Sequence, residues 1–133
     1  MKLKFRVWNI LTKQWVRYFA IDNYRRVYEV VENHYVDGEN ILQQKYNIGA
    51  FEINLFTGIT DINGVDIYFG DILKMHSEDE TKYTYGNVIY LDESALWYIE
   101  GEINDGLGDM SYYNYLEVVG NIYENDLSEY VKD

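Results

Sequence analysis

The chain has 133 residues, a net charge of −12 and no cysteine. This length fits one domain, because domains of roughly 100 to 150 residues are the most common size. Hydrophobic residues make up 47% of the chain and aromatic residues 17%, which excludes the aromatic-poor composition of disordered proteins. We expect one domain over residues 1–133, with an amino-terminal β/α region over residues 1–50 and a β-barrel region over residues 51–133.

The absence of cysteine excludes disulfides, thiolate zinc sites and a cysteine nucleophile. The chain has no apolar run near the roughly 20 residues of a membrane span, and its first residues lack the apolar core of a signal peptide. The sequence therefore predicts a cytosolic protein without a membrane role.

Charge is divided unevenly along the chain. Residues 1–36 hold seven Lys/Arg and three Asp/Glu, whereas residues 37–133 hold four Lys/Arg and twenty Asp/Glu. Nucleic-acid affinity comes largely from Lys and Arg, so the acidic part argues against nucleic-acid binding. Only the amino-terminal segment is suited to a polyanion.

The first residues predict a β-hairpin. The apolar Leu3, Phe5 and Val7 alternate with Lys4, Arg6 and Trp8, as in a strand with one buried face. After a polar turn over residues 9–13, residues 14–19 are the expected partner strand.

Residues 23–35 allow two interpretations. Asp22 can cap a helix in which Tyr24, Val27, Tyr28 and Val31 share one face. The same residues from position 27 onward are β-branched enough for a strand. We favour the helix, with turns following at residues 37–38 and 47–49.

From residue 51 onward, short apolar runs recur between glycine-bearing turns, which favours a small barrel. The expected strands are Phe51 to Phe56, Ile67 to Tyr68, Asp71 to Met75, Tyr85 to Leu91, Ala95 to Glu100 and Leu116 to Ile122. Asn63-Gly64 predicts a tight turn, because both residues tolerate positive φ. Residues 92–94 close a hairpin, residues 104–109 are an expected exposed loop, and residues 126–129 have the form of a capping box before a short helix.

Three segments, taken in order, resemble the YopX family of phage and prophage proteins. They are KFRVW at residues 4–8, FTGITDINGVDIYFGDILK at residues 56–74 and LEVVGNIYEN at residues 116–125. The resemblance implies a phage or prophage origin, the host bacterial cytoplasm and self-assembly. It also implies a mainly β fold, a β-rich α+β class, with an amino-terminal β-hairpin region and a small SH3-like barrel in the second half.

The motif residues also have a structural interpretation, which we favour. Gly70 allows a sharp turn and Asp71 can accept backbone hydrogen bonds, while Asn121 and Asn125 can satisfy turn groups and Ile122 can complete the core. The alternative is a ligand or partner surface. Its candidate residues are Thr57, Asn63, Tyr68, Asp71, Asn121, Tyr123, Glu124 and Asn125.

No catalytic, cofactor or metal site is predicted. The two histidines, His34 and His76, stand far apart in the sequence, and no phosphate-binding glycine loop or nucleophile elbow is present. Tyr112, Tyr113 and Tyr115 lie in or beside an acidic loop, which favours contact with protein over nucleic acid. Most tyrosines are expected to wall the core.

Three hypotheses follow for function. The first is a non-enzymatic, self-associating module that binds another host or phage protein. The second is an acidic mimic of nucleic acid that inhibits a host DNA-binding protein. The third is nucleic-acid binding through the basic residues Lys2, Lys4, Arg6, Lys13, Arg17, Arg25 and Arg26.

Overall fold

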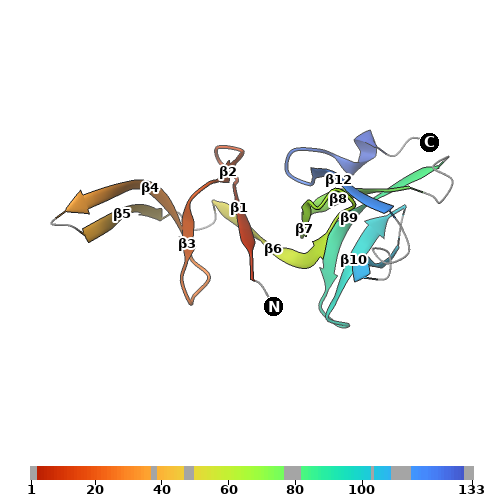
Figure 1. Cartoon of the computed structure of the whole chain (residues 1–133), viewed down its shortest axis with the longest axis horizontal. Coiled ribbons are helices and arrows are strands. Elements are labelled where there is room, and N and C mark those ends of the chain that lie inside the picture. Colours follow the sequence, from red (N-terminus) through yellow and green to blue (C-terminus); the bar gives the residue numbers. More distant parts are fainter. Residues whose placement is uncertain are drawn as a thin grey trace. The chain divides into compact units, whose positions relative to one another are not determined.

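The computed structural model describes residues 3–36, 39–46, 50–76, 82–102, 104–108 and 115–130 (Figure 1). Strands make up most of these residues, so the expected mainly β class is confirmed. The chain divides into two compact units. We call residues 6–53 the amino-terminal unit, and residues 1–5 together with 54–133 the carboxy-terminal unit. That all 133 residues form a single domain stays a prediction.

The amino-terminal unit is built from antiparallel hairpins. In β1 and β2, Val7 lies opposite Val16 and Trp8 opposite Trp15, which confirms the predicted first hairpin. Buried valines from separate strands form its core, with half-buried Phe and Ile around them. The strands are β1 (Phe5–Asn9), β2 (Gln14–Val16), β3 (Phe19–Ile21), β4 (Val27–Val36) and β5 (Glu39–Tyr46).

The helix favoured for residues 23–35 is wrong. The Asp22 carboxylate accepts hydrogen bonds from the backbone N–H groups of Tyr24 and Arg26, at 2.8 and 2.9 Å. It therefore closes a turn, and Arg25 has a φ of 63°, a left-handed conformation that ends any helix. The β-branched residues beyond form β4, which pairs with β3 and β5. The turns expected at residues 37–38 and 47–49 lie outside the described residues.

The carboxy-terminal unit contains a five-stranded antiparallel sheet in the order β11-β10-β9-β8-β12, which curls into a half-barrel. β6 (Phe51–Thr60) runs through both units and pairs with β1 and β7. The other elements are β7 (Asp66–Tyr68), β8 (Asp71–His76), β9 (Tyr83–Leu91), β10 (Leu96–Gly101), β11 (Asp105–Gly106), β12 (Tyr115–Asn121) and the 3-10 helix η1 (Leu127–Glu129).

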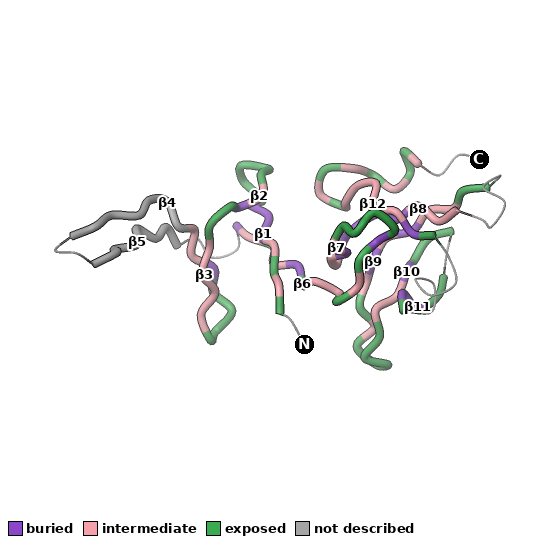
Figure 2. The backbone as a smooth tube through the Cα atoms, in the orientation of Figure 1, coloured by how far each residue is buried: buried purple, intermediate pink, exposed green. Residues whose placement is uncertain are grey.

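The main core of this unit draws on most strands of the sheet and on β7, and its buried residues are purple in Figure 2. Its fully buried side chains come from segments far apart in the sequence and include Ile67, Leu73, Val88, Ile99 and Leu107. The exposed loop expected at residues 104–109 is wrong in part, because Asp105–Gly106 pairs with β10 and Leu107 is fully buried. The acidic and glycine-rich composition of this stretch concealed one apolar residue that the core requires.

Two predicted turns and the predicted cap are confirmed. Gly64 has a φ of 79° in the turn between β6 and β7, and residues 92–95 connect β9 to β10. Asp126 caps η1, with Glu129 completing a capping box. The core role expected for Ile122 is wrong, because this side chain is 43% exposed.

Candidate interaction surfaces

Asp61 joins the β6–β7 turn to β12 in the carboxy-terminal unit. One carboxylate oxygen accepts hydrogen bonds from the N–H groups of Asn63 and Val65, at 2.8 and 2.9 Å. The other accepts from the N–H of Val118, at 2.9 Å. Asp61 is only 7% exposed, so the carboxylate exchanges water for three backbone donors. Asp61 is not among the eight candidate residues predicted from the sequence.

Thr57 holds an irregular part of β6. Its hydroxyl donates to the Ile67 carbonyl at 2.7 Å and accepts from the Ile59 N–H at 3.2 Å. Gly58, with a φ of 85°, lies inside the register shift between β6 and β7. The hydroxyl therefore supplies the hydrogen bonds that the bulge removes from the ladder.

Asp71 begins β8 after the turn at Gly70. Its carboxylate accepts a hydrogen bond from the Tyr68 N–H at 2.8 Å, and the residue is 1% exposed. Gly70 has a φ of 85°, and its carbonyl oxygen accepts a hydrogen bond from the Ile122 N–H at 2.9 Å. The predicted turn roles of Gly70 and Asp71 are confirmed.

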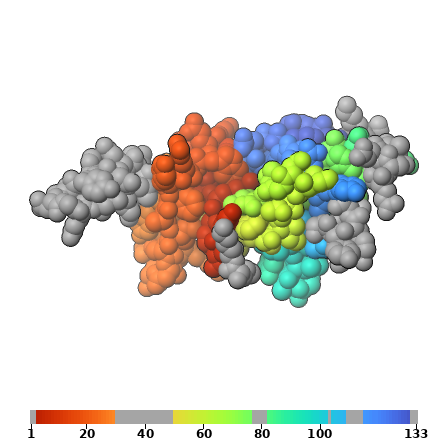
Figure 3. All heavy atoms as spheres, viewed as in Figure 1, coloured from red at the N-terminus to blue at the C-terminus, as the bar shows by residue number. Residues whose placement is uncertain are grey.

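Asn121 and Asn125 fold the segment that follows β12. The Asn121 amide oxygen accepts from the N–H groups of Tyr123 and Glu124, and the Asn125 amide oxygen accepts from the Asn121 N–H. The Tyr123 hydroxyl accepts a 2.6 Å hydrogen bond from the Asn54 amide. Figure 3 shows the surface of this segment, in blue, beside that of residues 54–70, in yellow and yellow-green. The predicted turn roles of both asparagines are confirmed.

The eight candidate residues thus differ in access to solvent. Asn63 and Glu124 are exposed, Asp71 is buried, and the others are half-buried. Most of their polar groups hold turns together, so the structure explains these motifs as parts of the scaffold. Whether the exposed members contact a partner stays a prediction.

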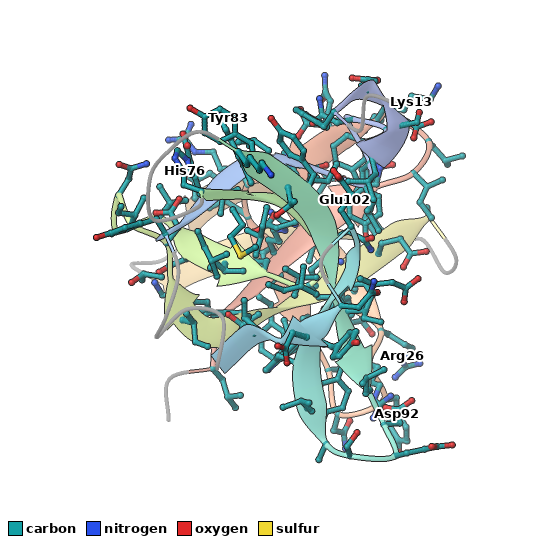
Figure 4. The ribbon with its side chains drawn as sticks, turned by 90° about the vertical axis from the view of Figure 1, so that its right-hand side faces the viewer. Lys13, Arg26, His76, Tyr83, Asp92 and Glu102 are labelled. Carbon is teal, nitrogen blue, oxygen red and sulfur yellow. The ribbon has the colours of Figure 1, made fainter. Side chains whose placement is uncertain are left out.

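A row of cations and aromatic rings lies in the amino-terminal unit. The Arg6 guanidinium lies 4.4 Å from the centre of the Trp15 ring, and Trp15 packs edge-on against Trp8. Arg17 lies over Tyr18, at 5.4 Å. Residues 6–28 hold five Lys/Arg and a single acidic residue, Asp22, whose carboxylate binds Arg26 at 2.7 Å. Lys13 lies in the turn between β1 and β2, and Arg26 lies in the turn between β3 and β4 (Figure 4).

The five-stranded sheet carries a cluster of polar and aromatic side chains. Lys74 and His76 alternate with the inward residues of β8 and therefore point away from the core. The Lys74 ammonium lies 4.0 Å from the centre of the Tyr83 ring, and the His76 ring packs edge-on against the same tyrosine (Figure 4). His76 also binds Glu117 at 3.2 Å. These side-chain contacts connect the neighbouring strands β8, β9 and β12.

The open edges of the sheets are mostly short or covered. Within the described residues, the outer strands β2, β3 and β7 have three residues each and β11 has two. The edge of β12 is covered, because Leu116 and Val118 bond to the β6–β7 turn. β5 is eight residues long and pairs with β4 alone. It is the longest strand at a sheet edge among the described residues.

The two units also differ in charge. Residues 6–53 hold six Lys/Arg and six Asp/Glu, whereas residues 1–5 and 54–133 hold five Lys/Arg and seventeen Asp/Glu. From these counts, the net negative charge of the chain resides in the carboxy-terminal unit. In the same unit, the hydrogen bond to Asp66, at 2.7 Å, raises the pKa of Lys4.

In the part of the chain that the structure describes, no three His, Cys, Asp or Glu side chains gather as metal ligands. No helix in that part is long and apolar enough to cross a membrane. Tyr112 and Tyr113 lie outside the described residues, as does the His34 side chain, whereas Tyr115 is 52% exposed.

A family model and a solved structure are similar to this chain. The family model described as YopX protein matches residues 4–127. The crystal structure of protein EF1440 from Enterococcus faecalis is similar, with a TM-score of 0.65 and 21% sequence identity, and the match covers 94% of this chain and 96% of that chain. At this identity the similarity shows the fold alone. No curated protein matches the chain.

Proposed function

Because the chain belongs to the YopX family, whose model matches nearly its whole length, we propose that it is a non-enzymatic module that self-associates and binds other proteins. The polar motif residues support this proposal, since Thr57, Asp61 and Asn121 bond to backbone groups of the same chain. Such residues build a scaffold. We place the module in the cytoplasm of a bacterium that carries a phage or prophage.

The observation that carries the proposal is the open edge of β5. β4 pairs with β3 only through Val27, Tyr28 and Glu29, and beyond these residues it pairs with β5 alone. A two-stranded hairpin is marginally stable in water, and an uncovered edge offers backbone donors and acceptors to a further strand. Strand addition is an established mode of protein recognition. A strand from another chain would therefore stabilise this hairpin.

The first experiment measures mass in solution. Light scattering during gel filtration, over a hundredfold range of protein concentration, should give a mass above the 15.8 kDa of one chain. A variant in which Asn-Gly replaces residues 32–43 would lose the edge but keep the pairing with β3. It should elute as a monomer with native circular dichroism. A wild-type monomer at every concentration would contradict self-association.

A second candidate function is binding of a polyanion such as single-stranded DNA. The observation that favours it is the row formed by Arg6, Trp15 and Arg17, because bases stack on aromatic rings and phosphates pair with guanidinium groups. Gel shifts at low salt should then show binding that Arg17→Ala weakens. The matched control is Lys82→Ala, in the acidic unit. Equal loss in both variants would assign the effect to net charge.

The acidic unit supports a third candidate, a mimic of nucleic acid. Its seventeen Asp/Glu are opposed by five Lys/Arg, so it presents carboxylates where a DNA-binding protein expects phosphates. The purified protein should then displace DNA-binding proteins of a bacterial lysate from immobilised DNA. A lysate in which it displaces none would contradict this function.

A further inference from the structure

The ends of β5 differ in charge, and this difference specifies how two copies can pair. The strand runs from Glu39 to Tyr46, and its charged residues are Glu39 and Lys45. An antiparallel pair of identical strands is related by a two-fold axis, so each residue position has one opposite position in the second copy. The position of the axis fixes every pair.

One axis position places opposite charges together. With the axis through Leu42, Glu39 stands opposite Lys45 of the second copy at both ends, and Asn40 stands opposite Gln44. With the axis through Ile41, Glu39 stands opposite Gln43, and Lys45 lies opposite a position beyond the end of the strand. With the axis through Gln43, Lys45 stands opposite Ile41, and Glu39 lies opposite a position beyond the end of the strand. An axis between two residues is impossible, because residues directly opposite in an antiparallel pair point to the same face, whereas positions 39 and 46 of one strand point to opposite faces. Opposite charges across strands are favourable, and like charges are not.

The neighbouring strand reinforces this choice. Lys45 already stands opposite Glu29 of β4 within the same chain. In the proposed pair, Lys45 would stand between Glu29 of its own chain and Glu39 of the second copy. The six-stranded sheet β3-β4-β5-β5-β4-β3 would then have short strands at both edges, because β3 has three residues.

From this complementarity we propose that β5 pairs antiparallel with β5 of a second copy, with the two-fold axis at Leu42. The inference rests on the proposed self-association and names its surface, its register and its partner. The pairing closes on itself, so it produces a dimer and not a fibre.

Cysteine crosslinking tests the register directly, because the natural chain has no cysteine to interfere. Leu42→Cys should form a covalent dimer under mild oxidation, since residues directly opposite have Cα atoms roughly 4.5 to 5.5 Å apart, within disulfide range. The matched control is Gln44→Cys, because the two copies of position 44 would lie about 13 Å apart. This variant should run as a monomer in non-reducing denaturing gels. Both variants should show native circular dichroism when reduced.

Charge exchange gives a second, independent test. E39K chains alone and K45E chains alone should each dimerise less than the wild type, because both pairs then carry like charges. An equal mixture should form a heterodimer, in which both pairs are again opposite. Thermal melting of each variant checks that its hairpin remains folded.

The outcomes separate the two proposals. A monomeric wild type contradicts both self-association and the register. A wild-type oligomer in which Gln44→Cys crosslinks as well as Leu42→Cys, or in which neither crosslinks, overturns the register and leaves self-association standing. A mixture of E39K and K45E that stays monomeric also overturns the register when both variants are folded.

Discussion

The carboxylate of Asp61 accepts a hydrogen bond from the backbone N–H of Val118, 57 residues further along the chain. The Ile62 N–H also donates to the carbonyl of Leu116, so the β6–β7 turn pairs with the outer edge of β12. An edge occupied in this way cannot accept a strand from another chain. The sheet is protected on this side, and β5 is left as the long open edge within the described residues.

Replacing Asp61 with alanine should destabilise the carboxy-terminal unit by about 2 to 4 kcal/mol, because three backbone donors lose a charged acceptor and two of them lie in a tight turn. Urea unfolding followed by tryptophan fluorescence measures this difference. The control is Asn63→Ala in the same exposed turn, which should change the free energy of unfolding by less than about 0.5 kcal/mol. Equal effects would mean that the carboxylate contributes little.

Gly120 should be intolerant of a side chain. A Cβ atom at this position would lie 2.5 Å from the Asn125 amide oxygen and 2.8 Å from the Tyr130 hydroxyl, so the closing segment would have to move. Gly120→Ala should therefore lower the free energy of unfolding by about 2 to 3 kcal/mol. Gly108→Ala is the matched control, since a Cβ there meets no atom within 4 Å. A stable Gly120→Ala protein would contradict this packing.

Asp22 should make stability depend on pH. Desolvation alone would raise its pKa, but hydrogen bonds from Arg26 and Tyr24 outweigh it and hold the pKa below the ordinary 3.8. A lowered folded-state pKa contributes stability above the unfolded value, and this contribution is lost as pH falls through the folded value. The difference in melting temperature between the wild type and Asp22→Asn should therefore be largest above about pH 5 and shrink toward pH 3. A difference independent of pH would contradict the prediction.

Local sequence signals predicted the turns and hairpins well. Gly64, Gly70 and the capping box of Asp126 were all predicted, because backbone conformation and nearby acceptors decide such features within a few residues. The closing segment was predicted in part. Its asparagines have the expected bonds, but Ile122 is exposed, since the sequence does not show which neighbours cover a side chain.

Long-range contacts could not be predicted. Residues 27–31 suit both a helix and a strand, and pairing with β3 and β5 decides between them. Leu107 stands among acidic residues and glycines, yet the core buries it completely. The full role of Asp61 could not be predicted, because its third donor, Val118, is distant in the sequence. The Asx-turn pattern of residues 61–65, in which an aspartate precedes Asn63-Gly64, was the signal that could have identified it.

Two basic loop residues should be replaceable by glycine with a gain in stability. Lys13 and Arg25 have φ values of 56° and 63°, a conformation that costs a residue with a Cβ roughly 1 kcal/mol or more relative to glycine. Lys13→Gly and Arg25→Gly should each raise the free energy of unfolding by up to about 1 kcal/mol, because the relief of strain is offset in part by the freedom that glycine adds to the unfolded chain. Asn23→Gly is the control, because Asn23 has no positive φ and glycine there only adds freedom to the unfolded chain. Chemical denaturation measures the free energy of unfolding of each variant. If Lys13→Gly lowers it as much as Asn23→Gly does, the strain at these loops is contradicted.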